Sequence, residues 1–169
     1  TGVMTVPSDG SVTTAKLGDS AVTYAKASGF GKLLQVVTAT DSTERSTSSS
    51  SFVTASNTLA VNITPSSTSS KIYVNCSFHF MTPTNQNQLR CTIFRDSTNL
   101  GDSDKGFGQL KNAADGTGNI LSLGSMAILD TPSTTAQVTY QLYMKTTAGT
   151  GKINANTGLS SITAFEIGG

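Results

Sequence analysis

The sequence predicts an all-β protein, and within that class an antiparallel two-sheet sandwich of the jelly-roll type. From residue 32 onward, apolar and polar residues alternate with the period of two that is typical of strands, and β-branched and aromatic residues are enriched. Clusters of Ser, Thr, Asn, Gly and Pro separate these segments, and no apolar stripe has helical spacing. About eight or nine short strands, joined by both hairpins and longer connections, fit a jelly roll.

The clearest strand runs from Lys71 to Phe80, and the next runs from Gln88 to Arg95. Between them, residues 82–87 are turn formers, so we expect these two strands to form a hairpin. Their alternation predicts that the core side chains are Ile72, Val74, Cys76, Phe78 and Phe80 on the first strand and Leu89, Cys91 and Ile93 on the second. Further strands are expected at Leu33–Thr40, Ser51–Ala55, Thr58–Thr64, Ile120–Leu129, Gln137–Thr146, Lys152–Ala155 and Ser161–Ile167.

The first thirty residues differ from the rest because they contain an imperfect ten-residue repeat, in which Val, Thr, Ala and Lys recur at fixed offsets. A unit this short cannot bury its apolar residues alone, so it must stack on neighbouring units or on other chains. We therefore expect a stalk over residues 1–30 and a β-sandwich head over residues 31–169. A flexible linker over residues 1–30 remains the alternative.

Composition excludes several classes of protein. Ser and Thr make up 50 of the 169 residues, charged residues only 12%, and the net charge is +1. Nucleic-acid binding needs clustered Lys and Arg, so we expect no nucleic-acid partner. No apolar run approaches the roughly 18 residues of a membrane span, so membrane insertion is not expected. Only 37 residues are Leu, Ile, Val or Phe, which predicts a lean core.

The candidate chemical groups are few. Cys76 and Cys91 lack metal-ligand spacing and His79 is the only histidine, so we expect no metal and no cofactor. Two buried reduced thiols are favoured, although a disulfide stays possible. Folding the hairpin about residues 84 and 85 would make the two thiols diagonal neighbours.

An enzymatic role is not expected. His79 lies on the strand face opposite the core without a nucleophile elbow, and we interpret it as a surface residue. Asp102, Asp104 and Asp115 share one Gly-rich loop that lacks the rigid carboxylate separation glycoside cleavage requires. Residues 102–106 match only the opening of a calcium loop.

Six short motifs follow one another along the chain: D-G-S-V-T-T-A-K-L at 9–17, G-K-L-L-Q-V-V at 31–37, N-I-T-P-S-S-T-S-S-K-I at 62–72, F-R-D-S-T-N-L at 94–100, L-D-T-P-S-T-T at 129–135 and S-I-T-A-F-E-I at 161–167. Taken in this order, they resemble a group of bacteriophage tail-fibre and virion proteins. The resemblance implies a homotrimeric virion fibre, assembled in the host cytoplasm. Its repeat stalk would join other virion proteins, and its β-sandwich head would attach the phage to a host surface glycan or protein receptor.

The lean core gives a separate reason for trimers, because the short repeat is not stable alone. From the repeat we expect Val12, Leu17 and Val22 at the trimer interface. From residues that we place opposite the core we expect Tyr73, Phe94 and Ile162, with Tyr143 and Ala164 as further outward-facing candidates.

Receptor contacts are expected on loops held by the rigid sandwich. The connection from Asp96 to Asn119 is longer than joining two strands requires. Amide, carboxylate and aromatic groups suited to polysaccharides are Asn85, Gln86, Asn87, Asp102, Asp104, Phe107, Gln109 and Tyr143. In the alternative arrangement, the long loop seals the trimer with Phe107 and Leu110 buried. Two other functions stay open: a purely structural head fibre, collar or decoration protein, and, less favoured, a polysaccharide-degrading spike.

Overall fold

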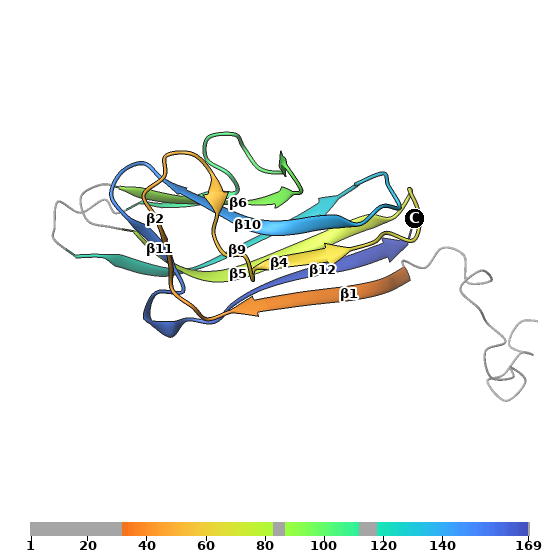
Figure 1. Cartoon of the computed structure of the whole chain (residues 1–169), viewed down its shortest axis with the longest axis horizontal. Helices are drawn as coiled ribbons and strands as arrows, with labels where there is room; N and C mark the ends of the chain where they lie inside the picture. Colours follow the sequence, from red (N-terminus) through yellow and green to blue (C-terminus); the bar gives the residue numbers. More distant parts are fainter. Residues whose placement is uncertain (1–31, 83–86, 112–117, 169) are drawn as a thin grey trace, which may run out of the picture. The chain divides into compact units, whose positions relative to one another are not determined.

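The computed structural model describes residues 32–82, 87–111 and 118–168, which form two β-sheets packed face to face (Figure 1). Sheet A contains β1 (Lys32–Asp41), β2 (Arg45–Thr47), β5 (Lys71–Thr82), β9 (Ile120–Asp130), β11 (Gly151–Ile153) and β12 (Ser160–Gly168). Sheet B contains β3 (Val53–Thr54), β4 (Ala60–Ile63), β6 (Gln88–Arg95), β7 (Thr98–Asn99), β8 (Gly108–Lys111) and β10 (Val138–Thr146). A single-turn 3₁₀ helix spans Ala155–Thr157. The repeat, with Val12, Leu17 and Val22, lies outside the described residues.

The topology is that of a jelly roll. Four strand positions are interrupted. In sheet A, β11 and β12 pair with successive parts of β5, and β2 and β1 pair in turn with β11 and β12. In sheet B, β3 and β4 pair with successive parts of β10, and β7 and β8 pair with successive parts of β6. Counting each such pair as one strand, sheet A is ordered β1/β2, β11/β12, β5, β9 and sheet B is ordered β3/β4, β10, β6, β7/β8. These are the eight strands of two interlocked Greek keys. The predicted all-β jelly-roll sandwich is therefore confirmed.

Alternating side chains from both sheets fill the interior. The side chains of Ile72, Val74 and Cys76 on β5 are fully buried. Those of Tyr140 and Leu142 on β10 are also fully buried. The inward faces predicted for the strands at 71–80 and 88–95 are thus confirmed. The sequence pattern does not predict β2, β7 and β8, because strands of two to four residues are too short to show a period.

The predicted hairpin between the strands at 71–80 and 88–95 is wrong. β5 belongs to sheet A, where it pairs with β9, β11 and β12, while β6 belongs to sheet B, where it pairs with β7, β8 and β10. The chain therefore crosses between the sheets after β5. Turn-forming residues and one buried face are common to a hairpin and to such a crossing, so the local pattern does not distinguish them.

The two cysteines face the shared interior from opposite sheets. Both are free and buried, as the favoured interpretation expected, but they are not diagonal neighbours in one hairpin. Burial raises the pKa of the Cys76 thiol to about 12. Burial, with the nearby Cys76, also raises the pKa of Cys91. Both thiols are therefore protonated, unreactive core groups.

The outward orientation expected for Ile162 and Ala164 is wrong. Both are fully buried core residues of β12, so neither is available to a second chain. Phe165 and Ile167 occupy the outward positions instead. Because both faces of β12 carry apolar side chains, alternation alone could not identify the buried one.

His79 is not a freely exposed surface residue. It is half-buried, and a side chain on Gly158 would overlap its ring. Its Nδ1 atom is buried without a hydrogen-bond partner among the described residues. The imidazole therefore packs under the chain that follows the 3₁₀ helix.

Candidate ligand-binding face on sheet B

The outward side of sheet B carries large polar and aromatic side chains. Leu89, Cys91 and Ile93 of β6 point into the core, so the alternate residues of that strand point outward. The same holds for β10, because Tyr140, Leu142 and Met144 are buried. The register places Lys145 opposite Arg90, Tyr143 opposite Thr92, and Gln141 opposite Phe94.

An aromatic cluster lies on this face. The rings of Phe94 and Tyr143 stack with centroids 4.0 Å apart and planes at 22°. Phe52, from the loop between β2 and β3, meets Phe94 edge-on at 6.3 Å. All three side chains are half-buried. The stacked pair is a diagonal cross-strand contact, which brings long side chains within reach of each other.

Two like charges lie directly opposite each other beside the aromatic cluster. Arg90 and Lys145 would repel in this cross-strand position. Asp104, from the loop between β7 and β8, accepts hydrogen bonds from Arg90 at 2.5 Å and from Lys145 at 3.1 Å. Lys145 Nζ also lies 4.7 Å from the centre of the Phe52 ring. The hydrogen bond from Lys145 lowers the pKa of Asp104, and the charge of Arg90 adds to this, although desolvation by itself would raise it.

Arg90 also orients two amides. Its guanidinium donates to Oε1 of Gln88 at 2.8 and 3.2 Å and to Oε1 of Gln109 at 3.2 Å. Because these bonds hold the carbonyl oxygens, the amide nitrogens turn away from Arg90. We call the whole set the sheet-B cluster: Phe52, Gln88, Arg90, Phe94, Asp104, Gln109, Tyr143 and Lys145.

The loop that supplies Asp104 is held by its own short-range hydrogen bonds. Asp102 accepts from the backbone N–H groups of Lys105 at 2.7 Å and Asp104 at 2.9 Å, which lowers the pKa of Asp102. Gly106 has φ of +66°, and a side chain there would clash with the Cys91 carbonyl oxygen. The loop therefore needs glycine at this position to lie close against β6.

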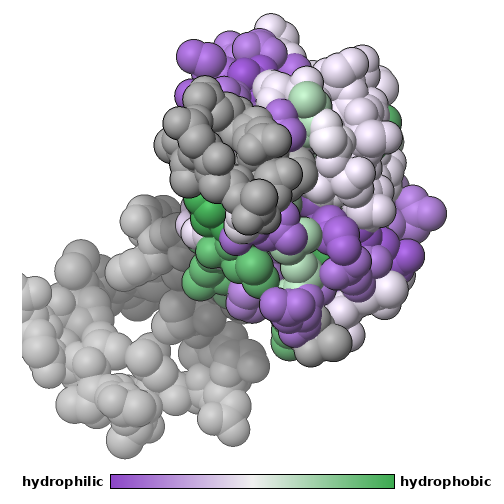
Figure 2. Space-filling model, turned by 90° about the vertical axis from the view of Figure 1, so that its left-hand side faces the viewer, coloured by the Kyte–Doolittle hydropathy of each residue, from purple (hydrophilic) through white to green (hydrophobic). Residues whose placement is uncertain are grey.

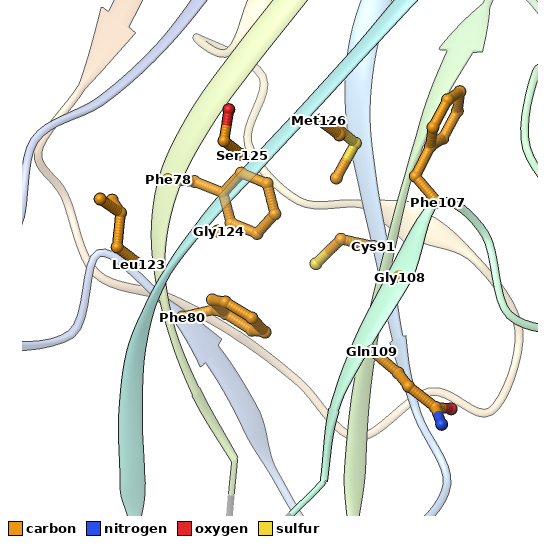
Figure 3. A pocket seen from close by; sticks show the side chains of 10 residues that line it. All are labelled: Phe78, Phe80, Cys91, Phe107, Gly108, Gln109, Leu123, Gly124, Ser125 and Met126. Carbon is orange, nitrogen blue, oxygen red and sulfur yellow. The ribbon is translucent and has the colours of Figure 1, made fainter.

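A cavity of about 230 Å³ lies between β5 and β9 of sheet A and β6 and β8 of sheet B. Figure 3 shows the side chains of Phe78, Phe80 and Cys91 converging on it, while Gln109 points away. Phe107 lines the cavity and packs against the core. Figure 2 shows apolar surface at the end of the sandwich where β9 begins, and Leu121 and Leu123 are exposed there.

The structure brings together only some of the residues expected to contact a receptor. Asp104, Gln109 and Tyr143 meet in the sheet-B cluster, where Phe94, expected at the trimer interface, joins them. Asp102 instead stabilises its own loop, and Phe107 is one of the residues that line the cavity. Phe107 and Leu110 are both half-buried. Asn85, Gln86 and Asp115 lie outside the described residues, while Asn87 is half-buried just before β6.

Phe52, Arg90 and Lys145 were not among the site residues expected from the sequence. The available signal was the outward positions of the two strands, which alternate with core residues. Without the register between β6 and β10, that signal could not show that Arg90 and Lys145 lie opposite each other.

Within residues 32–82, 87–111 and 118–168, no group of three or more His, Cys, Asp or Glu side chains could hold a metal ion. No helix in that part of the chain is long and apolar enough to cross a membrane.

These observations define a jelly-roll domain with a polar and aromatic cluster on one outer sheet face. No family model and no curated protein matches the sequence. Solved structures do show similarity. One of infectious bursal disease virus, Gx strain, is 17% identical over 78% of this chain, with a TM-score of 0.42. Another, of the VP2 subviral particle of infectious bursal disease virus, is 15% identical over 79%, with a TM-score of 0.40. The match spans only 36% and 38% of those chains.

Proposed function

We propose that this chain is a structural virion protein, the head of a homotrimeric fibre that attaches a phage to its host. The motif order at 9–167 supports this role through its resemblance to phage fibre proteins. The observation that carries the proposal is a set of apolar side chains on the outer face of sheet A, which we call the apolar band: Leu34, Val36, Tyr73, Leu129 and Phe165. We interpret the apolar band as the surface between copies of the chain.

The apolar band crosses all four strand positions of sheet A. Phe165 on β12 and Leu129 on β9 are both register partners of Tyr73 on β5, and the rings of Tyr73 and Phe165 lie 6.0 Å apart. On β1, the Thr38 hydroxyl lies 2.9 Å from that of Thr163 on the outer face, so residues two and four positions earlier share that face. The apolar band therefore consists of Leu34, Val36, Tyr73, Leu129 and Phe165.

The exposure of these side chains favours a protein partner. Leu129 is 50%, Val36 48% and Tyr73 37% exposed. Single exposed apolar residues are ordinary, but a contiguous apolar surface is typical of an interaction site. Because this chain has few apolar residues, burying the apolar band against other copies would add to a small total of buried apolar surface and so stabilise the assembly.

The position of the apolar band along the chain favours a second copy of this chain as the partner. The repeat segment leads into β1, and β1 supplies Leu34 and Val36 to the apolar band. An association that starts in the repeat would therefore continue onto the first strand of the head. Tyr73, Phe94 and Ile162 were all expected at the trimer interface. In the proposed arrangement only Tyr73 lies there, because Phe94 belongs to the sheet-B cluster and Ile162 to the core.

Sedimentation equilibrium tests the assembly. At micromolar concentration we expect a species of three chains of 17.4 kDa each. Leu129→Glu places a charge in the apolar band and should shift the protein toward monomer. Leu159→Glu is the matched control, because Leu159 is 62% exposed outside the apolar band, and it should leave the trimer intact. A stable wild-type monomer, or equal effects of the two variants, would contradict the proposal.

Gold-labelled antibodies against the chain test its place on the particle. Labelling of external fibres, with loss of adsorption to host cells when the antibodies are bound, is the expected result. Labelling of the particle without any effect on adsorption would instead favour a purely structural decoration or collar protein. Absence of label from intact particles would contradict a virion role.

A further inference from the structure

We propose that the sheet-B cluster binds a neutral pyranose unit of a surface glycan, with Phe94 and Tyr143 as the stacking platform. This inference rests on the proposed attachment function and names its ligand and its site.

The aromatic pair provides the apolar part of the site. Phe94 and Tyr143 project from the outer side of their strands, so the core does not need them. The partly exposed rings offer an apolar surface for the C–H face of a pyranose. Gln141, opposite Phe94, is fixed beside them because its Nε2 donates to the Ser56 carbonyl oxygen at 3.0 Å.

The polar groups beside the platform are oriented before any ligand arrives. Arg90 holds the carbonyl oxygens of Gln88 and Gln109, which leaves their amide N–H groups to donate to sugar hydroxyls. Asp104 keeps 63% of its side chain exposed while Oδ1 accepts from Arg90 and Lys145, so the carboxylate can accept from a hydroxyl. Side chains fixed in advance lose less conformational entropy on binding.

The charge arrangement favours a neutral sugar over an acidic one. The Arg90 and Lys145 side chains are only 13% and 11% exposed, and Asp104 pairs with both. A ligand carboxylate would therefore find both cations covered and would meet the exposed Asp104 carboxylate first. The two cations position the loop and the amides rather than the ligand.

The test is binding of the purified 1–169 chain to an array of immobilised neutral and uronic-acid or sialic-acid oligosaccharides. We expect binding to neutral oligosaccharides. Tyr143→Ala should weaken it by roughly tenfold or more, whereas Tyr143→Phe keeps the ring and should retain most of it. Gln109→Ala should weaken binding, while Gln137→Ala, which removes an exposed amide outside the sheet-B cluster, should not. Circular dichroism of each variant shows that it is folded.

Failure of this inference is separable from failure of the proposed function. Binding confined to acidic sugars would overturn it, as would equal effects of Gln109→Ala and Gln137→Ala. Absence of glycan binding by a protein that is trimeric and labels external fibres would overturn the glycan site and leave the virion role intact. Recognition of a host protein through the same face would overturn it in the same way.

Discussion

A buried carboxylate near the end of β12 makes the stability of the fold depend on pH. Glu166 is fully buried, and it accepts hydrogen bonds from Gln35 Nε2 at 2.5 Å and from the backbone N–H and hydroxyl of Ser66, both at 2.6 Å. These bonds tie β12 to β1 and to the loop between β4 and β5. We predict that Glu166→Gln destabilises the protein strongly at neutral pH.

The expected magnitude follows from the pKa of Glu166. Burial alone would raise this pKa, but the hydrogen bonds from Gln35 and Ser66 outweigh burial and lower it from the ordinary 4.5 to about 2. Because the folded-state pKa is depressed, the stabilisation is fully present above pH 4.5 and is lost as the pH falls toward 2. The difference corresponds to roughly 3 kcal/mol at pH 7 and roughly 1 kcal/mol at pH 3.

The assay is urea unfolding of wild type and variant at pH 7 and pH 3, at one protein concentration because the stability of the proposed trimer would depend on it. The free-energy difference between the two proteins should shrink from roughly 3 to roughly 1 kcal/mol. Burial would raise the pKa of Asp41 too, but hydrogen bonds from Ser56 and Thr43 lower it, and this effect cancels because both proteins share it.

Glu44→Gln is the matched control. Glu44 is the other glutamate of the chain, it is 46% exposed, and its salt bridge to Lys152 at 2.7 Å lies on the surface. Its loss should cost less than about 1 kcal/mol, with little change between the two pH values. A Glu166→Gln effect that is the same at pH 7 and pH 3, or no larger than that of Glu44→Gln, would refute the reasoning.

Two further predictions concern the loop after β7 and the core. Gly106→Ala should cost roughly 1–3 kcal/mol in urea unfolding, because φ is +66° and the added Cβ clashes with the Cys91 carbonyl oxygen; Gly108→Ala, with open space around its Cβ, should cost less, and equal losses would count against the close approach of the loop. The thiols of Cys76 and Cys91 should resist a disulfide reagent in the native protein and react once it is unfolded; rapid native labelling of both would contradict their burial.

The sequence alone determined the fold class, most strand positions and the buried face of the strand at 71–80. These features depend on local alternation, because a strand with one buried face must place apolar residues at every second position. Ile72, Val74 and Cys76 were assigned in this way, and all three are fully buried. The reduced state of the cysteines was also the favoured interpretation, and it is confirmed.

Only the tertiary structure decided which strands are neighbours and which groups meet. Alternation defines two faces of a strand but not its partner, so β5 and β6 were wrongly paired and Ile162 was placed on the wrong face of β12. The sheet-B cluster depends on the register that sets Arg90 opposite Lys145 and on a loop that brings Asp104 between them. Such contacts join residues far apart in the chain, and the burial and charge pairing of the whole sandwich select them.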